Sequence, residues 1–420
     1  MHRFQTGGWH RGAASAAVDK HRRQMSKEKK ERVLADIDHI PNYVLAEIKS
    51  IFINIRKEKF YLEMRPVKFF ILLLSMHLFS LQAVENKPPY PLSESPQLPL
   101  EVYGIEFAEI LGGRPQLVHL AKGFGFTEGP VYFSVKDRDE GYLIFTDQLN
   151  DNINMIRWHG LNPFNQISAL SWSDAVIFRH PSNIADGQTA DLEGRLLTAE
   201  TTGKRVSITE ANGEVSTLVG FYKGKPLNSP NDLVVKSDGT VWFTDPSYGS
   251  LQFPQESYLP NNVYRYDPKT KELDVVIDSL KMPNGLAFSP DEKILYVIDS
   301  AAIQAPRTYY NENPHAIYAF DVIEGGIKLS NKRLFTVVAP GFPDGMRLDK
   351  RGNIYVGAMD GVQVFNPDGK LIGKIRMPKE TANLTFGGKD NNILFICSSD
   401  SVWAIKLNVQ GARPVPILPL

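Results

Sequence analysis

The chain has 420 residues with 47 basic and 47 acidic side chains, so its formal net charge is zero. This balance excludes the strong positive field that nucleic-acid-binding proteins use, and we expect no nucleic-acid partner. A single cysteine, Cys397, excludes an intramolecular disulfide, and its apolar neighbours predict a buried core residue.

The first hundred residues differ in character from the rest. Residues 1–63 carry basic stretches without sustained apolar periodicity, which predicts a disordered extension. Residues 64–84 begin with Met64 and a basic pair, continue with an apolar run and reach a small residue at Ala83, which is typical of a signal peptide. The apolar run is shorter and more interrupted than the roughly 20 residues of a membrane-spanning helix.

Signal peptides begin at the N-terminus, so we hypothesise that Met64 is the true initiator and that 1–63 is a start-site artefact. The mature protein would then be secreted or periplasmic, with no stable membrane span. Two alternatives stay open, a signal anchor formed by 69–84 behind a cytoplasmic extension, and a cytoplasmic protein. Residues 85–99 are proline-rich and linker-like, so the folded domain is expected over 100–420.

The domain contains six repeats at intervals of about 40 to 60 residues. Each repeat has a polar residue, a short apolar strand, a turn rich in Asp, Gly or Lys, and a second apolar strand. The first strands are expected near 127–132, 182–185, 230–234, 283–288, 343–348 and 382–386. Four short strands in about 50 residues is the size of a propeller blade, so the pattern predicts an all-β fold, a six-bladed β-propeller.

In a propeller the first strand of every blade lines the central channel. A polar residue at one register in each first strand therefore places six side chains around one axis: Glu128, Asn183, Asn231, Asn284, Asp344 and Asn383. Asn and Asp also cap strand ends, but capping does not require the same register in six repeats. We therefore expect a functional ring.

The ring offers carboxylate and amide oxygens and neither His nor Cys, which favours one divalent cation, most often Ca²⁺, with Mg²⁺, Mn²⁺ or Zn²⁺ as substitutes. Glu128 and Asp344 supply two negative charges that match such an ion. A cation held from one side can polarise a carbonyl or phosphoryl oxygen, which is the chemistry of an esterase or lactonase. A purely structural ion is the alternative.

The sequence resembles the senescence-marker-protein/gluconolactonase family over about residues 120 to 408, and its microbial gluconolactonase-like branch most of all. The resemblance rests on several stretches in the right order: 178–183, 227–239, 242–249, 283–292 and 341–345. It implies a calcium-type site whose motif positions fall on Glu128, Asn231, Asn284 and Asp344. It also implies that Asp344 is the general base. Relatives often carry a His in the segment that is 199–205 here, and this chain has Thr there.

These observations predict a metal-dependent hydrolase that opens a small lactone, such as a sugar lactone, to the hydroxy acid. The cation would polarise the carbonyl and Asp344 would accept a proton from water. Asn183 and Asp232 lie beside the expected channel and are candidates for binding substrate hydroxyls. The alternatives are an organophosphate or aryl-ester hydrolase on the same site, and a non-catalytic propeller that binds a partner. A small-molecule substrate and a monomer are expected.

Overall fold

The computed structural model describes residues 99–161, 166–168, 172–303, 310 and 312–417. The expected extension, signal peptide and nearly all of the linker lie outside these residues. Strands dominate the described chain, and helices are confined to α4 (Ile105–Leu111), α5 (Tyr248–Gln252), η1 (Gln148–Asn150) and η3 (Glu324–Gly326).

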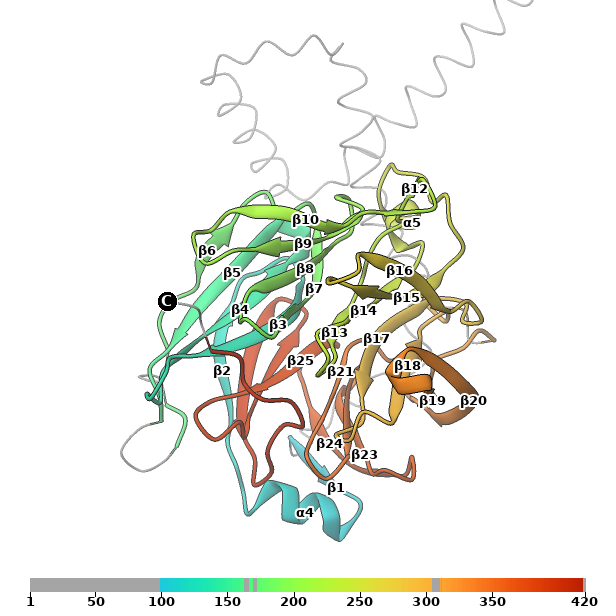
Figure 1. The fold of residues 1–420 in the computed structure, drawn as a ribbon. Helices are drawn as coiled ribbons and strands as arrows, with labels where there is room; N and C mark the ends of the chain where they lie inside the picture. The colour runs from blue at the N-terminus through green and yellow to red at the C-terminus, as the bar shows by residue number, and fades with distance from the viewer. Residues whose placement is uncertain (1–98, 162–165, 169–171, 304–309, 311, 418–420) are drawn as a thin grey trace, which may run out of the picture. The chain divides into compact units, whose positions relative to one another are not determined.

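The strands form six antiparallel sheets that follow one another in chain order (Figure 1). The first two sheets are β3 (Thr127–Ser134), β4 (Gly141–Asp147), β5 (Asn152–Trp158) and β6 (Val176–Arg179), then β7 (Ala185–Ala190), β8 (Leu196–Glu200), β9 (Arg205–Thr209) and β10 (Val215–Val219). The next two are β13 (Leu233–Val235), β14 (Val241–Asp245), β15 (Asn262–Asp267) and β16 (Glu272–Ile277), then β17 (Pro283–Phe288), β18 (Ile294–Asp299), β19 (Ala316–Ile323) and β20 (Lys328–Val337). A short hairpin, β11 (Phe221–Tyr222) and β12 (Lys225–Pro226), lies between the second and third sheets in sequence.

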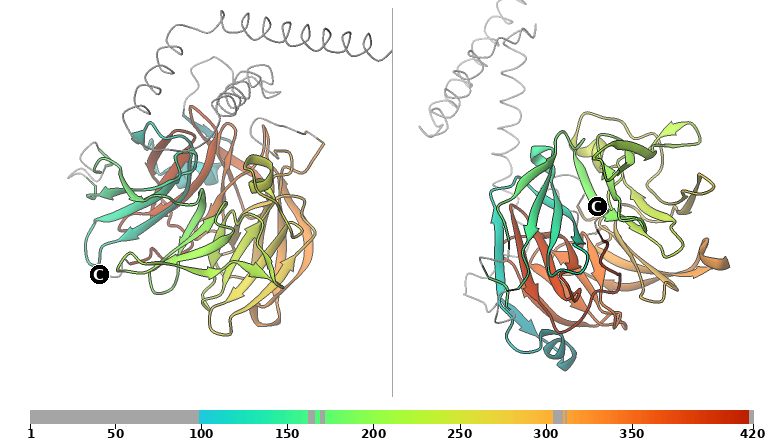
Figure 2. Two further views of the ribbon diagram at one scale, coloured as in Figure 1. Left: turned by 90° about the horizontal axis from the view of Figure 1, so that it is seen from above. Right: turned by 60° about the vertical axis from the view of Figure 1, so that its left-hand side comes forward.

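The last two sheets combine the C-terminal part of the domain with its N-terminal strands. β21 (Met346–Leu348), β22 (Ile354–Ala358), β23 (Gly361–Phe365) and β24 (Leu371–Arg376) are extended by β1 (Leu100–Val102). β25 (Thr381–Gly387), β26 (Ile393–Ser398) and β27 (Ser401–Lys406) are completed by β2 (Leu117–Lys122) as the outer strand. The sixth sheet therefore joins the two ends of the domain, and in Figure 2 its red strands lie beside the blue-green strands of the first sheet.

The six sheets form a closed ring. Each inner strand lies beside the inner strands of the two neighbouring sheets, and β25 of the last sheet lies beside β3 of the first. Six hydrophobic clusters fill the spaces between successive sheets, and each draws its side chains from two neighbouring sheets. Cys397 belongs to the cluster between the sixth and first sheets, which confirms its prediction as a core residue. The six-bladed propeller is thereby confirmed.

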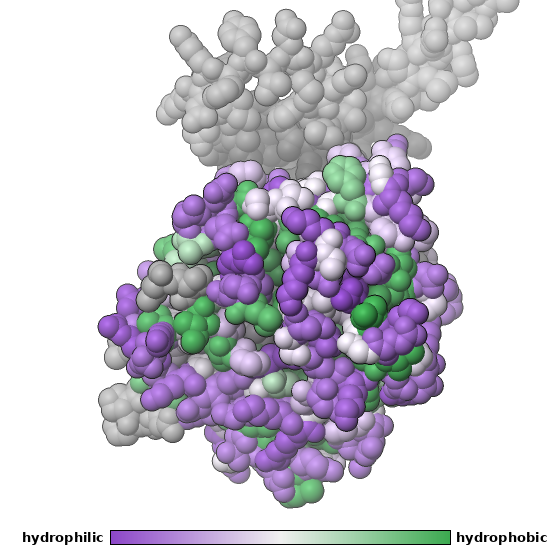
Figure 3. All heavy atoms as spheres, viewed as in Figure 1, coloured by the Kyte–Doolittle hydropathy of each residue, from purple (hydrophilic) through white to green (hydrophobic). Residues whose placement is uncertain are grey.

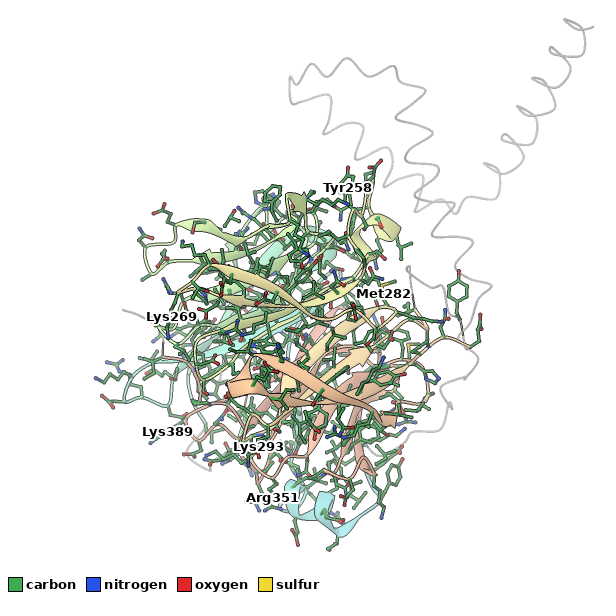
Figure 4. The ribbon with its side chains drawn as sticks, turned by 45° about the vertical axis from the view of Figure 1, so that its right-hand side comes forward. Tyr258, Lys269, Met282, Lys293, Arg351 and Lys389 are labelled. Atoms are coloured by element: carbon green, nitrogen blue, oxygen red, sulfur yellow. The ribbon has the colours of Figure 1, made fainter. Side chains whose placement is uncertain are left out.

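The turns between the first and second strands of the sheets lie at one end of the ring, so they distinguish its two ends. Each inner strand leads into its neighbour through a short turn, as at Gly239 and Gly352, whose φ angles of 89° and 85° suit glycine. Lys293 and Arg351 lie in two of these turns, at the end away from Tyr258 (Figure 4). We call the end with these turns the hairpin end, and the end where the inner strands begin the open end.

The face seen in Figure 3 is mostly hydrophilic, with hydrophobic residues in small separate groups. Within the described part of the chain, no helix is both long enough and apolar enough to cross a membrane.

Candidate active site

Polar side chains gather where the inner strands begin. Glycines allow this close approach, because a Cβ on Gly129 would stand 2.1 Å from the carbonyl oxygen of Asp186. Gly187 N–H donates to Asn231 O at 2.7 Å, and Gly285 N–H donates to Asp344 O at 3.1 Å. These contacts cross from one sheet to the next, so they bring the starts of the inner strands together around the axis. We call the side chains there the axial cluster: Glu128, Asp186, Asn231, Asp232, Asn284, Asp344, Arg347 and Asn383.

Four carboxyl groups of the axial cluster interact with one another. Burial raises the pKa of Glu128 well above its usual value, and the charges of Asp344, Asp186 and Asp232 raise it further. Burial and the charges of Asp344 and Asp232 likewise raise the pKa of Asp186. Four acids so placed cannot all stay ionised without a compensating positive charge.

Asp344 is partly exposed, whereas the other three acids are buried. Its pKa is raised to about 7 by burial among its neighbours, against hydrogen bonding from Asn284. A carboxyl group with a pKa near neutrality exchanges protons readily at physiological pH.

Among the described residues, Arg347 supplies the positive side chain of the axial cluster. Its Nη1 lies 3.7 Å from Oδ2 of Asp232, and it donates a hydrogen bond to the carbonyl oxygen of Met346 at 2.7 Å. Burial raises the pKa of Asp232, and the charge of Arg347 opposes that rise. One arginine compensates one of four acids, so the cluster retains a surplus of negative charge when its acids are ionised.

The amides of the cluster are oriented by these acids. Asn231 Nδ2 donates to Asp186 Oδ2 at 2.7 Å, which turns the carbonyl oxygen of Asn231 away from the acid. Asn383 Nδ2 donates to Glu128 Oε2 at 2.9 Å, and its Oδ1 accepts from Leu384 N–H at 2.9 Å. Asn383 thus uses both ends of its amide within the protein. Asn231 keeps an oxygen for a ligand.

The structure brings together every predicted metal ligand: Glu128, Asn231, Asn284 and Asp344. Asp232, predicted to bind substrate, also lies in the cluster. Its Oδ1 accepts from Leu233 N–H at 2.8 Å, and its buried Oδ2 has no closer partner among the described residues than Arg347.

Asn183 does not lie in the predicted ring. β7 begins only at Ala185, and Asn183 Nδ2 donates to Glu200 Oε2 at 2.8 Å instead. Asp151 Oδ1 accepts from the N–H groups of Ser182 and Ile184, at 3.0 and 2.7 Å, and holds this segment in an extra turn. Asn183 and Ile184 accordingly have φ angles of 61° and 50°. The prediction for Asn183 as a ring residue is wrong, because that turn shifts the register by three residues.

Asp186 occupies the position expected for Asn183, and sequence reasoning missed it. The signal that could have found it is an acid or amide followed by glycine. Asp186-Gly187 matches Asn284-Gly285 and Asp344-Gly345 in this respect. The glycine marks the point where neighbouring inner strands touch, so it fixes the register better than an isolated Asn does.

The donor chemistry of the axial cluster fits a hard divalent cation. No three His, Cys, Asp or Glu side chains of the described residues form a metal-binding group by themselves. The candidate ligand set instead joins two carboxylates, Glu128 and Asp344, to the amide oxygens of Asn231 and Asn284. Glu128 Oε2 accepts from Gly129 N–H at 2.5 Å and from Asn383, which leaves Oε1 for a ligand. Oxygen donors with a surplus of negative charge match Ca²⁺ or a similar ion.

Comparison with known proteins agrees with the resemblance found in the sequence. Residues 126–400 match the model of the SMP-30/gluconolactonase/LRE-like region. A gluconolactonase of Zymomonas mobilis is 30% identical over 302 residues, which cover 70% of this chain and 81% of that protein. A lactonohydrolase of Aspergillus oryzae is 30% identical over 214 residues, covering 48% of this chain and 49% of that protein.

Solved structures agree on the fold. A gluconolactonase from Xanthomonas campestris superposes with a TM-score of 0.63 at 30% identity, covering 76% of this chain and 99% of that one. Regucalcin from Agrobacterium tumefaciens, described as a calcium-binding protein, has a TM-score of 0.55 at 16% identity over 73% of this chain and 98% of that one. At that identity the likeness to regucalcin concerns the fold alone.

Proposed function

The chain belongs to the SMP-30/gluconolactonase/LRE-like family, and from this premise we propose that it hydrolyses small lactones to hydroxy acids with the help of one divalent cation. The observation that carries the proposal is the axial cluster, in which four acids interact and Arg347 pairs with one of them, Asp232. The lactone-hydrolysing names of the related proteins support the substrate class.

Glu128, Asn231, Asn284 and Asp344 would hold the cation, with Ca²⁺ as the leading candidate. When bound, the ion supplies positive charge that polarises the lactone carbonyl and stabilises negative charge on its oxygen. Asn383 and Gly129 hold the Glu128 carboxylate by hydrogen bonds to Oε2. Asp186 holds the amide of Asn231. These contacts keep the ligand oxygens in place before a substrate arrives.

Asp344 serves as the general base in this proposal. It is the partly exposed acid of the cluster, so its carboxylate is the one that an attacking water can reach and give a proton to. Oδ2 of Asp232 has Arg347 at 3.7 Å but no hydrogen-bond donor among the described residues, so Asp232 is the candidate to accept a hydrogen bond from a substrate hydroxyl. Burial raises the pKa of Asp232, and the charge of Arg347 opposes that rise and so favours the ionised form.

The test is a pH-indicator hydrolysis assay with sugar lactones, alkyl lactones and aryl esters, before and after chelation and with added Ca²⁺. We expect lactone turnover that chelator abolishes and Ca²⁺ restores. Asp344→Asn should lose activity by at least about 10²-fold, whereas Asp291→Asn, an exposed acid at the hairpin end, should not. Activity that survives exhaustive chelation would refute the cation, and hydrolysis of esters but no lactone would refute the substrate class.

We also propose that the protein is exported, on the signal-peptide pattern of residues 64–84. Mass spectrometry of the native protein would find a mature N-terminus shortly after Ala83. A native peptide from within residues 30–60 would instead support the longer, anchored or cytoplasmic form.

A further inference from the structure

Helix α5 lies in the link between β14 and β15, at the open end of the third sheet. Asp245 at the end of β14 pairs with Asn262 at the start of β15, and β13 begins at the same end. The link therefore rises beside the inner-strand start that carries Asn231 and Asp232. Tyr258, in the same link, lies at this end in Figure 4.

The link is held firmly on its own sheet. Ser229 Oγ accepts from Gly249 N–H at 2.9 Å and donates to Pro246 O at 2.5 Å. Asn228 Oδ1 accepts from the N–H groups of Tyr258 and Leu259, each at 3.1 Å. Residues at the start of the link and near its end are thus tied to the segment just before Asn231.

A second set of contacts ties the link to the second sheet. Gln255 Nε2 donates to Thr201 O at 3.1 Å, and Lys204 Nζ donates to Glu256 O. A link fixed at this many points presents its side chains in a set geometry before any ligand binds.

Tyr248, the first residue of α5, is turned inward from this link. Its side chain is 8% exposed and packs against Met282 and Ala301 of the fourth sheet. Met282 directly precedes the strand β17 that carries Asn284, so the ring of Tyr248 ends close to the axial cluster.

The phenol group lies near enough to Asn284 to interact with its side-chain amide. The charges of Asp344 and Asp186 act on the phenol and, with burial, raise the pKa of Tyr248 well above its usual value. The phenol is neutral at physiological pH even at its ordinary pKa of about 10. Within the described residues, its O–H donates to Ser300 O at 3.5 Å, the outer limit of a hydrogen bond. The hydroxyl therefore has a proton to donate beside Asn284 and Asp344.

We propose that the Tyr248 hydroxyl donates a hydrogen bond to the ring oxygen of the lactone, the atom that leaves when the ring opens. This inference rests on the proposed lactonase function. Water adds its oxygen to the carbonyl carbon, and the bond from that carbon to the ring oxygen breaks with its electron pair on the ring oxygen. A proton from the water passes through Asp344 to the ring oxygen and makes the new hydroxyl, while the carboxylic acid loses its proton to solvent. Tyr248 keeps its own proton and stabilises the charge that develops on the ring oxygen.

The experiment compares Tyr248→Phe with wild type on a lactone and on the thiolactone of the same ring size. An alkoxide is a poor leaving group that needs a donor, whereas a thiolate leaves more easily and accepts hydrogen bonds weakly. We expect kcat on the lactone to fall about 10²-fold, with KM and Ca²⁺ affinity unchanged and the thiolactone rate reduced less than about threefold. Tyr258→Phe, an exposed residue of the same link, is the control and should match wild type on both substrates.

An equal loss on both substrates, or no loss on the lactone, would overturn the role of Tyr248 while leaving the lactonase function intact. A fall in Ca²⁺ affinity that accounts for the lost rate would also overturn it, because Tyr248 would then act by holding Asn284. If wild type opens the lactone but not the thiolactone, a fall in kcat at unchanged KM and Ca²⁺ affinity supports the proposal, and any other pattern refutes it. A wild-type protein that opens no lactone with Ca²⁺ bound would overturn the proposed function itself, and the Tyr248 inference with it.

Discussion

At the scale of single residues, the axial cluster contains more acidic than basic side chains. Glu128, Asp186 and Asp232 are buried, Asp344 is partly exposed, and Arg347 compensates only part of their charge. Each acid has a raised pKa, so in the metal-free protein each costs stability when it ionises. A divalent cation removes this cost, which couples metal binding to pH.

The sign of that coupling gives the first prediction. Because the folded-state pKa values lie above the ordinary value near 4, the metal-free protein loses stability as pH rises from about 4 through about 7, the pKa of Asp344. Ca²⁺ binds the ionised acids, so the rise in Tm that saturating Ca²⁺ gives should increase between pH 5 and pH 8. Differential scanning fluorimetry with Ca²⁺ or with chelator measures this. A Ca²⁺-induced rise that is constant with pH would contradict it.

Asp186 gives the second prediction. Because it holds the amide of Asn231 at 2.7 Å, Asp186→Ala should free that ligand and weaken Ca²⁺ affinity by about 10- to 100-fold. Isothermal titration calorimetry measures the affinity. The matched control is Asn183→Ala, because Asn183 lies outside the cluster and binds Glu200. If both substitutions weakened Ca²⁺ affinity equally, Asn183 would have to be counted among the residues of the site.

At the scale of elements, three sheets use one device to fix the start of the inner strand. A carboxylate at the end of the second strand accepts two backbone N–H groups from the segment that precedes the inner strand. Asp147 binds Gly125 and Phe126, Asp245 binds Asn228 and Ser229, and Asp299 binds Lys281 and Met282. The second sheet differs, because Glu200 binds only side chains, those of Arg179, Arg205 and Asn183. The backbone N–H groups of the segment before β7 bind Asp151 instead. This difference is the local cause of the register shift at Asn183.

The third prediction concerns this device. Asp147→Ala leaves the part-buried N–H groups of Gly125 and Phe126 without their acceptor, and a fully buried unpaired donor costs about 1 to 3 kcal/mol. We expect the free energy of unfolding to fall by about 2 to 4 kcal/mol. Urea denaturation measures it, with the exposed Asp278→Ala as control. A change for Asp147→Ala within the error of that control would show that water replaces the carboxylate.

At the scale of the whole domain, both termini close the ring. β2 completes the sixth sheet from the N-terminal side. The C-terminal segment 410–417 crosses the hairpin end. Lys350 N–H donates to Gln410 O at 2.8 Å, Arg413 pairs with Glu292, and Ser134 N–H donates to Pro416 O at 2.9 Å. These partners belong to the fifth, fourth and first sheets, so one short segment joins sheets on opposite sides of the ring.

The fourth prediction follows from that segment. A chain ending at Gln410 should fold, because all six sheets are complete without residues 411–420. It should lose about 2 to 4 kcal/mol of stability with the contacts of Gly411, Ala412, Arg413 and Pro416. Its activity per folded molecule should be unchanged, since the axial cluster lies at the open end. Thermal denaturation and the lactone assay measure the two effects, and a selective loss of activity would place the segment in the site.

The six-bladed architecture and the central residues of the axial cluster could be predicted from the repeats in the sequence. Repeated apolar strands and glycine turns specify local structure, and six such repeats can bury their faces only against one another. Glu128, Asn231, Asn284 and Asp344 were predictable for the same reason, because each stands at a fixed place in its repeat.

Which further residues lie beside these central residues depends on contacts between neighbouring sheets. Asp151, on a neighbouring sheet, turns the segment 182–184, so Asp186 rather than Asn183 reaches the axis. A helical turn in the third sheet's link brings Tyr248 beside Asn284 of the fourth. Such contacts join residues far apart in the chain, and their geometry depends on how neighbouring sheets pack, which no repeat pattern encodes.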